Sequence, residues 1–185
     1  MRNFAAVAFT LLVLGTIASA QAPTSGNVFF GYSYYNTDLS SIGRTNTNGW
    51  EGTLEGKALP HLGIVADFSG HYGSQNFVVG GVCGLVCYPT TANENVAVHN
   101  VLFGPRFSAS VGKFRPFVEF EFGVAHLGTN SLGSQTCFAN AVGGGLDYRI
   151  IRPIAWRFQG DYVSTHFFST YQTNVRLSTG IVLRF

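Results

Sequence analysis

Hydrophobic and polar residues alternate with a period of two along most of this 185-residue chain. Such alternation places successive side chains of a strand on opposite faces, and it recurs here in segments of roughly ten residues. In one segment, for example, Val118 and Phe120 alternate with Glu119 and Glu121. The pattern predicts an all-β protein with eight strands, over residues 28–35, 50–58, 62–72, 95–107, 117–127, 138–150, 154–164 and 173–185.

The first 20 residues have the features of a secretory signal peptide. Arg2 supplies a positive charge, residues 4–14 form an apolar stretch, and Ala18-Ser19-Ala20 is a small-residue cleavage motif. We therefore expect residues 1–20 to be removed during export and residues 21–185 to form one domain. After residue 20, the sequence contains no run of 18 consecutive apolar residues, which is about the length that a membrane-spanning helix requires.

The expected connections alternate in length. Those after the first, third, fifth and seventh segments are long, about 14, 22, 10 and 8 residues, and rich in Asn, Thr, Ser and Gly, whereas those after the second, fourth and sixth are tight or moderate and carry Pro or basic residues. An even number of antiparallel strands with long loops at one end and short turns at the other is typical of transmembrane β-barrels. The sequence therefore predicts an eight-stranded, antiparallel, up-and-down transmembrane β-barrel whose short turns and termini face the periplasm.

The two faces of the expected strands admit two kinds of barrel. In a soluble, lipocalin-like carrier the apolar face would point inward around a ligand, whereas in a membrane barrel it points outward into lipid. Periodicity does not distinguish them. The lipid-facing arrangement is favoured by the strand lengths and by large aromatic residues towards the strand ends, namely Trp50, Tyr72, Tyr148, Trp156 and Tyr162.

The last strand carries the most specific pattern, because Ile181, Leu183 and Phe185 alternate up to a terminal aromatic residue. It resembles the C-terminal signature that the barrel-assembly machinery of bacteria reads, with Leu183 and Phe185 as the assembly signal. The chain as a whole resembles the OmpA-like outer membrane protein β-barrel domain family through Gly49–Gly52, Leu62–Gly70, Phe103–Phe107, Gly143–Asp147 and Arg176–Phe185. That resemblance implies a barrel in the bacterial outer membrane, among outer-membrane lipid and lipopolysaccharide, and it implies no single activity.

The polar faces of the strands carry most of the charge. Eight-stranded barrels are just wide enough to be filled by side chains, and buried charges must be paired. We therefore expect a network that plugs the lumen, consisting of Glu51, Glu55, Lys57, Asp67, His71, Arg106, Glu119, Glu121, Asp147, Arg149, Arg157, Asp161, Arg176 and Arg184. A narrow pore for small solutes or ions through this network is the alternative.

Within the network, Glu119 and Glu121 lie two residues apart on one strand face. That spacing could serve acid–base chemistry, but we expect these carboxylates to pair with Arg106 and Arg149 on the flanking strands.

The longest expected loop, residues 73–94, contains Cys83 and Cys87. In an oxidising compartment we expect these two to form a disulfide and to leave Cys137 over, with a bridge from Cys137 to either of them as the alternative. The apolar run over residues 77–82 exceeds what a loop needs. It suggests a hairpin that extends the strands above the membrane and is available to a surface ligand.

No motif indicates an enzyme. Lipid A deacylases of this shape carry a His-x-Ser-Asn motif at an outer strand end, and neither His126-Leu127-Gly128-Thr129 nor Ser164-Thr165-His166 matches it. The cysteines lack the spacing of a metal site, and a net charge of +2 indicates no nucleic-acid partner. We expect a small structural surface protein with no cofactor and no catalytic activity.

Overall fold

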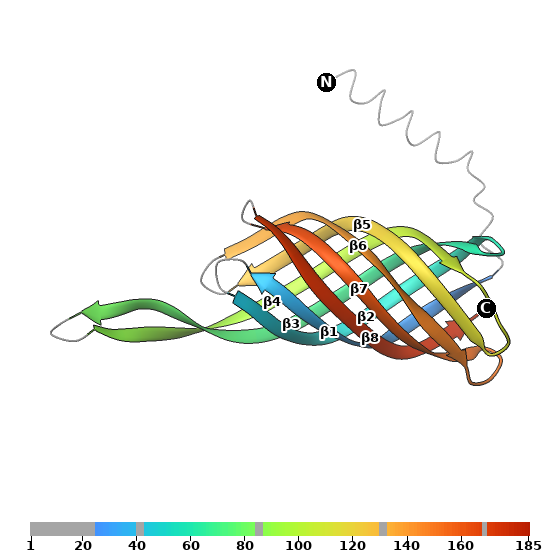
Figure 1. Cartoon of the computed structure of the whole chain (residues 1–185), viewed down its shortest axis with the longest axis horizontal. Helices are drawn as coiled ribbons and strands as arrows, with labels where there is room; N and C mark the ends of the chain where they lie inside the picture. The colour runs from blue at the N-terminus through green and yellow to red at the C-terminus, as the bar shows by residue number, and fades with distance from the viewer. Residues whose placement is uncertain (1–24, 40–42, 84–86, 130–132, 168–169) are drawn as a thin grey trace, which may run out of the picture.

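The computed structural model describes residues 25–185 apart from 40–42, 84–86, 130–132 and 168–169, and at 38–39, 43, 75–83, 87–94, 133, 167 and 170–171 it describes the backbone alone. Its strands are β1 (Gly26–Leu39), β2 (Gly43–Leu59), β3 (Leu62–Cys83), β4 (Cys87–Ser108), β5 (Phe114–Thr129), β6 (Gly133–Arg149), β7 (Ile154–Phe167) and β8 (Thr170–Arg184). Each strand pairs antiparallel with its neighbour in sequence, and β1 also pairs with β8 (Figure 1). The predicted fold, a closed eight-stranded up-and-down barrel, is confirmed.

No helix among the described residues is long and apolar enough to cross a membrane.

The two ends of the barrel differ. At one end, which we call the turn end, short connections over 60–61, 109–113 and 150–153 join the strands. The described chain also begins and finishes there, since Gly26 N donates to Phe185 O at 2.9 Å and Phe185 N donates to Gly26 O at 3.1 Å. The predicted signal peptide, residues 1–20, lies outside the described residues.

The opposite end, which we call the hairpin end, is where the strands run longer than predicted. β3 and β4 stay paired from Leu62 opposite Phe107 as far as Cys83 opposite Cys87. They project far beyond the rest of the barrel (Figure 1), because β3 pairs with β2 only up to Tyr72 and β4 with β5 only up to Val96. The expected loop over 73–94 is thus mostly a two-stranded ribbon, as its apolar run suggested.

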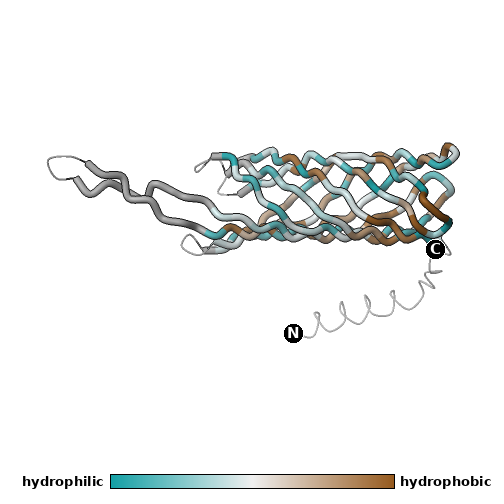
Figure 2. Tube along the Cα trace, turned by 90° about the horizontal axis from the view of Figure 1, so that it is seen from below, coloured by the Kyte–Doolittle hydropathy of each residue, from teal (hydrophilic) through white to brown (hydrophobic). Residues whose placement is uncertain are grey.

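Side chains on the outer face of the barrel are apolar and exposed. More than 60% of the surface is exposed for Phe30, Val118 and Phe158. The residues that alternate with the outward ones along each strand point inward. Hydropathy therefore alternates along the strands (Figure 2). An exterior of this kind is compatible with lipid and not with water, which argues against the alternative of a soluble carrier with an inward apolar face and agrees with the predicted lipid-facing barrel.

The apolar exterior ends part of the way along the strands at the hairpin end. On β1 and β2 the outward residues change from Phe30 and Trp50 to a polar ladder, in which the hydroxyl of Tyr34 donates to Asn46 Oδ1 at 2.7 Å. Strand pairing continues through this polar section because cross-strand hydrogen bonds do not require an apolar face. Trp50 and Tyr72 therefore lie at the edge of the apolar belt and not at the ends of their strands.

Candidate functional site

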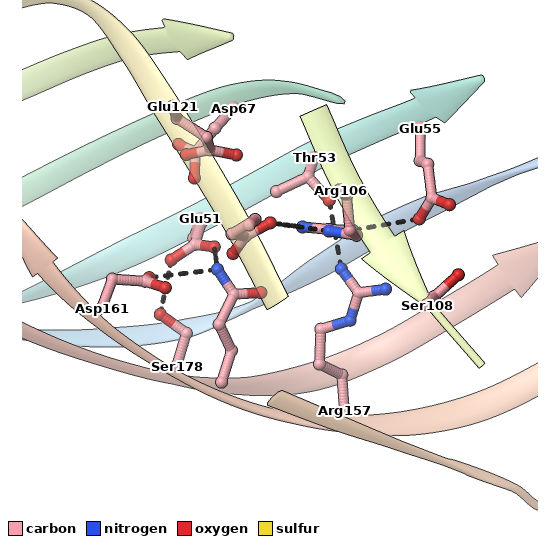
Figure 3. Close-up of polar contacts among 12 residues, drawn as sticks. Glu51, Thr53, Glu55, Asp67, Arg106, Ser108, Glu121, Arg157, Asp161 and Ser178 are labelled. Atoms are coloured by element: carbon pink, nitrogen blue, oxygen red, sulfur yellow. Dashed lines mark hydrogen bonds and ion pairs between the residues drawn. The ribbon is translucent and has the colours of Figure 1, made fainter. Parts of the chain in front are cut away.

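The interior of the barrel near the turn end is filled by a cluster of buried ion pairs, which we call the turn-end cluster. Arg106 on β4 is fully buried, and its Nε lies 2.6 Å from Glu119 Oε2 on β5. The Nη1 atom of the same guanidinium lies 3.2 Å from Glu55 Oε2 on β2. One arginine thus joins three strands across the lumen (Figure 3).

A second arginine completes this cluster from the other side of the barrel. Arg157 on β7 holds Asp147 on β6 through Nε–Oδ1 at 2.7 Å and Nη2–Oδ2 at 3.2 Å, which is the two-pronged geometry that makes Arg–carboxylate pairs strong. The Asp147 carboxylate is shared, since Arg184 Nη2 lies 3.2 Å and Arg115 Nη1 3.7 Å from its Oδ2.

The two central guanidinium groups both contact one aromatic ring. The Cζ atoms of Arg106 and Arg157 lie 4.5 Å and 4.6 Å from the centroid of the Phe117 ring. Each contact is a cation–π interaction, which is worth about 0.5 to 2 kcal/mol depending on desolvation. Phe117 therefore lets two like charges share a narrow interior.

A second set of charges lies further from the turn end, and we call it the mid-barrel cluster. Arg176 on β8 is fully buried and contacts Asp67 (Nη2–Oδ2, 2.7 Å), Asp161 (Nε–Oδ2, 2.9 Å) and Glu51 (Nε–Oε2, 3.3 Å). A fourth carboxylate, Glu121, lies 3.8 Å away. One guanidinium thus faces four acidic groups, and neither oxygen of Glu121 has a hydrogen-bond partner within the described structure.

Uncharged groups satisfy part of this acidic excess. Ser178 donates its hydroxyl hydrogen to Glu51, and Gln159 Nε2 donates to Glu51 Oε1 at 3.1 Å. On the hairpin side, His71 Nε2 lies 2.8 Å from Ser33 Oγ, and the His71 ring stacks on Tyr35 with centroids 4.7 Å apart.

The interior beyond the mid-barrel cluster contains an apolar cluster, which the sequence patterns did not predict. A buried cluster fills the lumen towards the hairpin end, formed by Tyr35, Val96, Val98, Leu102, Ala125, Leu127, Ala139, Ala141 and Val163. The lumen is therefore filled by ion pairs in one section, and in the next by apolar side chains together with buried threonine, asparagine and glutamine side chains.

Two members of the predicted network lie outside it. Arg149 is exposed at the turn end and donates from Nη2 to the carbonyl oxygen of Gly112 at 2.9 Å, so the prediction that it pairs with Glu121 is wrong. Lys57 is half-buried at the same rim, with Nζ 3.5 Å from the carbonyl oxygen of Pro60. Both are the last inward positions of their strands, where the lumen opens.

The structure places the remaining predicted residues in the interior, with Glu119 beside Arg106 as expected, except for Arg184, which is half-buried at the turn end. One member of the turn-end cluster was missed. Arg115 is 3% exposed, forms an ion pair with Glu55 and donates to Ser108 Oγ at 2.7 Å. It lies just before the predicted strand 117–127, and extending that strand's alternation backwards past Pro116 would have placed it inside.

Among the described side chains, Cys137 and His126 lie on different faces of the barrel wall. Cys137 is a free, half-buried cysteine on β6. Cys83 and Cys87 are opposite each other in the β3–β4 register, but the predicted disulfide concerns side chains outside the described set. His126 is exposed on the outer face, with Nδ1 2.8 Å from Thr136 Oγ1.

Within the described ranges, no three His, Cys, Asp or Glu side chains gather so that they could hold a metal ion.

Comparisons with known proteins identify the architecture. No family model and no curated sequence matches the chain. Among solved structures, Neisserial surface protein A matches with a TM-score of 0.66 at 11% identity, over 86% of this chain and 97% of that one. Ail, the attachment invasion locus protein of Yersinia pestis, in complex with the heparin analogue sucrose octasulfate, matches with a TM-score of 0.58 at 14% identity, over 87% and 98%.

These likenesses and the geometry agree. A closed barrel that is apolar outside and ion-paired inside satisfies every backbone group within lipid and keeps its charges away from it. The chain therefore has the fold of the eight-stranded outer-membrane β-barrels.

Proposed function

We propose that this protein is a non-catalytic surface barrel of the OmpA-like type, whose sealed lumen anchors the β3–β4 hairpin above the outer membrane. The observation that carries the proposal is the filling of the lumen. Arg106, Arg157 and Arg176 are each fully buried and reach across the lumen to strands that are not their neighbours. A barrel whose interior is filled by ion pairs serves as a rigid support, and we expect the segments outside the membrane to carry out recognition.

The hairpin has the features of a recognition element. It extends beyond residues 72 and 96 without a flanking strand, so the backbone groups on its two outer edges are available to another chain or to a surface ligand. In the same class of fold, Ail has been crystallised with a sulfated heparin analogue. We propose surface contact through the β3–β4 hairpin and expect the last strand, with Leu183 and Phe185, to direct insertion.

Epitope accessibility on intact cells tests this proposal. A short epitope inserted between residues 84 and 86 is expected to bind antibody on intact cells, whereas the same epitope inserted in the turn over 150–153 is expected to bind only after the outer membrane is permeabilised. Equal labelling at both positions without permeabilisation, or labelling of the turn alone, would contradict the proposed orientation.

A narrow pore is the second candidate function, and one observation favours it. The mid-barrel cluster has four carboxylates around one arginine, and both oxygens of Glu121 accept no hydrogen bond within the described structure. Such a site attracts cations and water. The apolar cluster around Leu102 and Leu127 lies across the same path, so conduction would require it to open.

A further inference from the structure

The charges of the described chain are divided between the inside of the barrel and one of its ends. All seven acidic side chains described are buried in the lumen, each 4% exposed or less: Glu51, Glu55, Asp67, Glu119, Glu121, Asp147 and Asp161. The basic side chains left outside the ion-pair clusters are exposed or half-buried. Arg44 lies towards the hairpin end, whereas Lys57, Lys113, Arg149 and Arg152 all lie at the turn end.

Backbone hydrogen bonds join these turn-end positions into one continuous rim. Arg149 N donates to Lys113 O at 2.8 Å, which places the β4–β5 turn beside the end of β6. Arg184 N donates to Pro153 O at 2.8 Å, which places the β6–β7 turn beside the end of β8. We call this arc, consisting of Lys113, Arg149, Arg152 and Arg184, the basic rim.

The basic rim contains a hollow with a mixed lining. A cavity of about 380 Å³ lies between Arg149, Arg152 and Arg184, and Ile151, Pro153 and Phe185 complete its wall. The side chains of Arg152 and Lys113 are exposed, and within the described part of the chain Arg184 Nε is buried with no hydrogen-bond partner. Guanidinium groups with free donors bind phosphate oxygens well.

Apolar side chains at the same turns fix the depth at which the rim lies. Val111, Ile150 and Ile151 are each more than half exposed, and they continue the apolar belt up to the charged groups. A surface with basic groups directly beside exposed aliphatic ones fits the boundary where lipid headgroups meet acyl chains.

We propose that the basic rim is a binding site for anionic phospholipids of the membrane leaflet at the turn end, with Arg149, Arg152 and Arg184 holding the headgroup phosphate. Ile151 and Phe185 contact the start of an acyl chain. This proposal rests on the membrane placement given under the proposed function, and it adds a lipid preference that a sealed barrel does not require.

The two tryptophans allow a direct test, because they are equally exposed at opposite edges of the belt. Trp156, 38% exposed, is the cross-strand partner of Tyr148, next to Arg149, whereas Trp50 is 39% exposed and lies towards the hairpin end. Trp50→Phe leaves the reporter near the basic rim, and Trp156→Phe leaves the reporter away from it. Each variant is reconstituted in vesicles that mix phosphatidylcholine and phosphatidylglycerol, with one lipid at a time brominated in its acyl chains, and fluorescence quenching is measured.

We expect phosphatidylglycerol to be preferred about fivefold over phosphatidylcholine beside Trp156 and not beside Trp50. Arg149→Gln/Arg152→Gln should reduce the preference to below about twofold, while Arg44→Gln leaves it unchanged. Arg152→Gln alone keeps the test valid if the double variant fails to fold, since no described side chain depends on Arg152.

Three results would overturn the proposal. The first is equal quenching by both lipids beside Trp156, and the second is a preference that survives the double substitution. The third is loss of the preference in inorganic phosphate but not in chloride of the same ionic strength, because that result would indicate a site for a free anion. Quenching of Trp50 by both lipids shows membrane insertion independently, so failure of the lipid preference is distinguishable from failure of the membrane placement.

Discussion

Replacing Arg176 with methionine is expected to lower the free energy of unfolding of the barrel by about 3 to 5 kcal/mol. The guanidinium is fully buried and lies within 3.3 Å of carboxylate oxygens of Glu51, Asp67 and Asp161. Methionine keeps most of the side-chain length, so packing changes little. The dominant effect is that these carboxylates and Glu121 lose the cation they surround.

The magnitude follows from the cost of leaving buried charges without a partner, which exceeds the net gain of forming the pair. The Asp and Glu groups no longer carry this penalty once they are protonated, so the deficit of Arg176→Met should grow as the pH is raised and should shrink as the pH is lowered. Adding Glu121→Gln to Arg176→Met removes one of the repelling charges and should restore part of the loss.

Urea unfolding of the refolded protein in phospholipid vesicles, followed by tryptophan fluorescence, measures these differences. Arg44→Met is the matched control, because Arg44 is exposed and donates to Asn36 Oδ1 at 3.2 Å. It should change the free energy of unfolding by no more than about 0.5 kcal/mol. A deficit for Arg176→Met below about 1 kcal/mol that is also independent of pH would refute the electrostatic reasoning.

Three further perturbations follow from the same geometry and are measured by the same unfolding assay. Glu119→Gln should destabilise the barrel by about 2 to 3 kcal/mol, because it weakens the contact with buried Arg106. Glu121→Gln, two residues along the same face, should be neutral or stabilising, because neither oxygen of Glu121 has a hydrogen-bond partner within the described structure. Equal effects of the two substitutions would contradict the different roles of the two carboxylates. Phe117→Leu should cost about 1 to 2 kcal/mol as two cation–π contacts are lost, and a cost below that of an outward Phe120→Leu would argue against those contacts. Gly104→Ala should destabilise the barrel by at least about 2 kcal/mol, since a Cβ there would lie 1.9 Å from the Phe120 carbonyl oxygen. Gly52→Ala should be tolerated, because the atom nearest to a Cβ there is 3.7 Å away. The reverse order would show that β4 and β5 approach each other less closely than in the structure.

The sequence pattern located all eight strands and separated the apolar from the polar face of most of them, because both depend on a period of two that one segment displays by itself. That the apolar face meets lipid was predicted from the strand lengths and the positions of large aromatic residues. The turn-end boundaries were also predicted, since Pro60 and Pro153 interrupt the pattern. Boundaries at the hairpin end were not. There β2 continues through Thr45 and Asn46, whose polar character resembles a loop although their backbone groups remain paired.

Pairing inside the lumen depends on register, which one strand's pattern does not contain. The sequence did predict that Arg106 lies beside Glu119, because both occupy inward positions on strands that are adjacent in sequence. Contacts across the barrel, such as Arg176 with Asp67 and Arg157 with Thr53, require closure and the stagger of the strands. The apolar cluster around Leu102 was missed because inward apolar residues interrupt the alternation only locally.

Single-channel conductance in planar bilayers tests the central claim, a lumen sealed by its own side chains. The refolded chain of residues 21–185 is predicted to show no conductance steps, and Arg149→Ala, which lies outside the network, should behave in the same way. Arg106→Ala/Arg157→Ala removes two of the arginines that cross the interior and should open a measurable leak. Steady conductance of the unaltered protein would contradict the sealed lumen and would favour a pore.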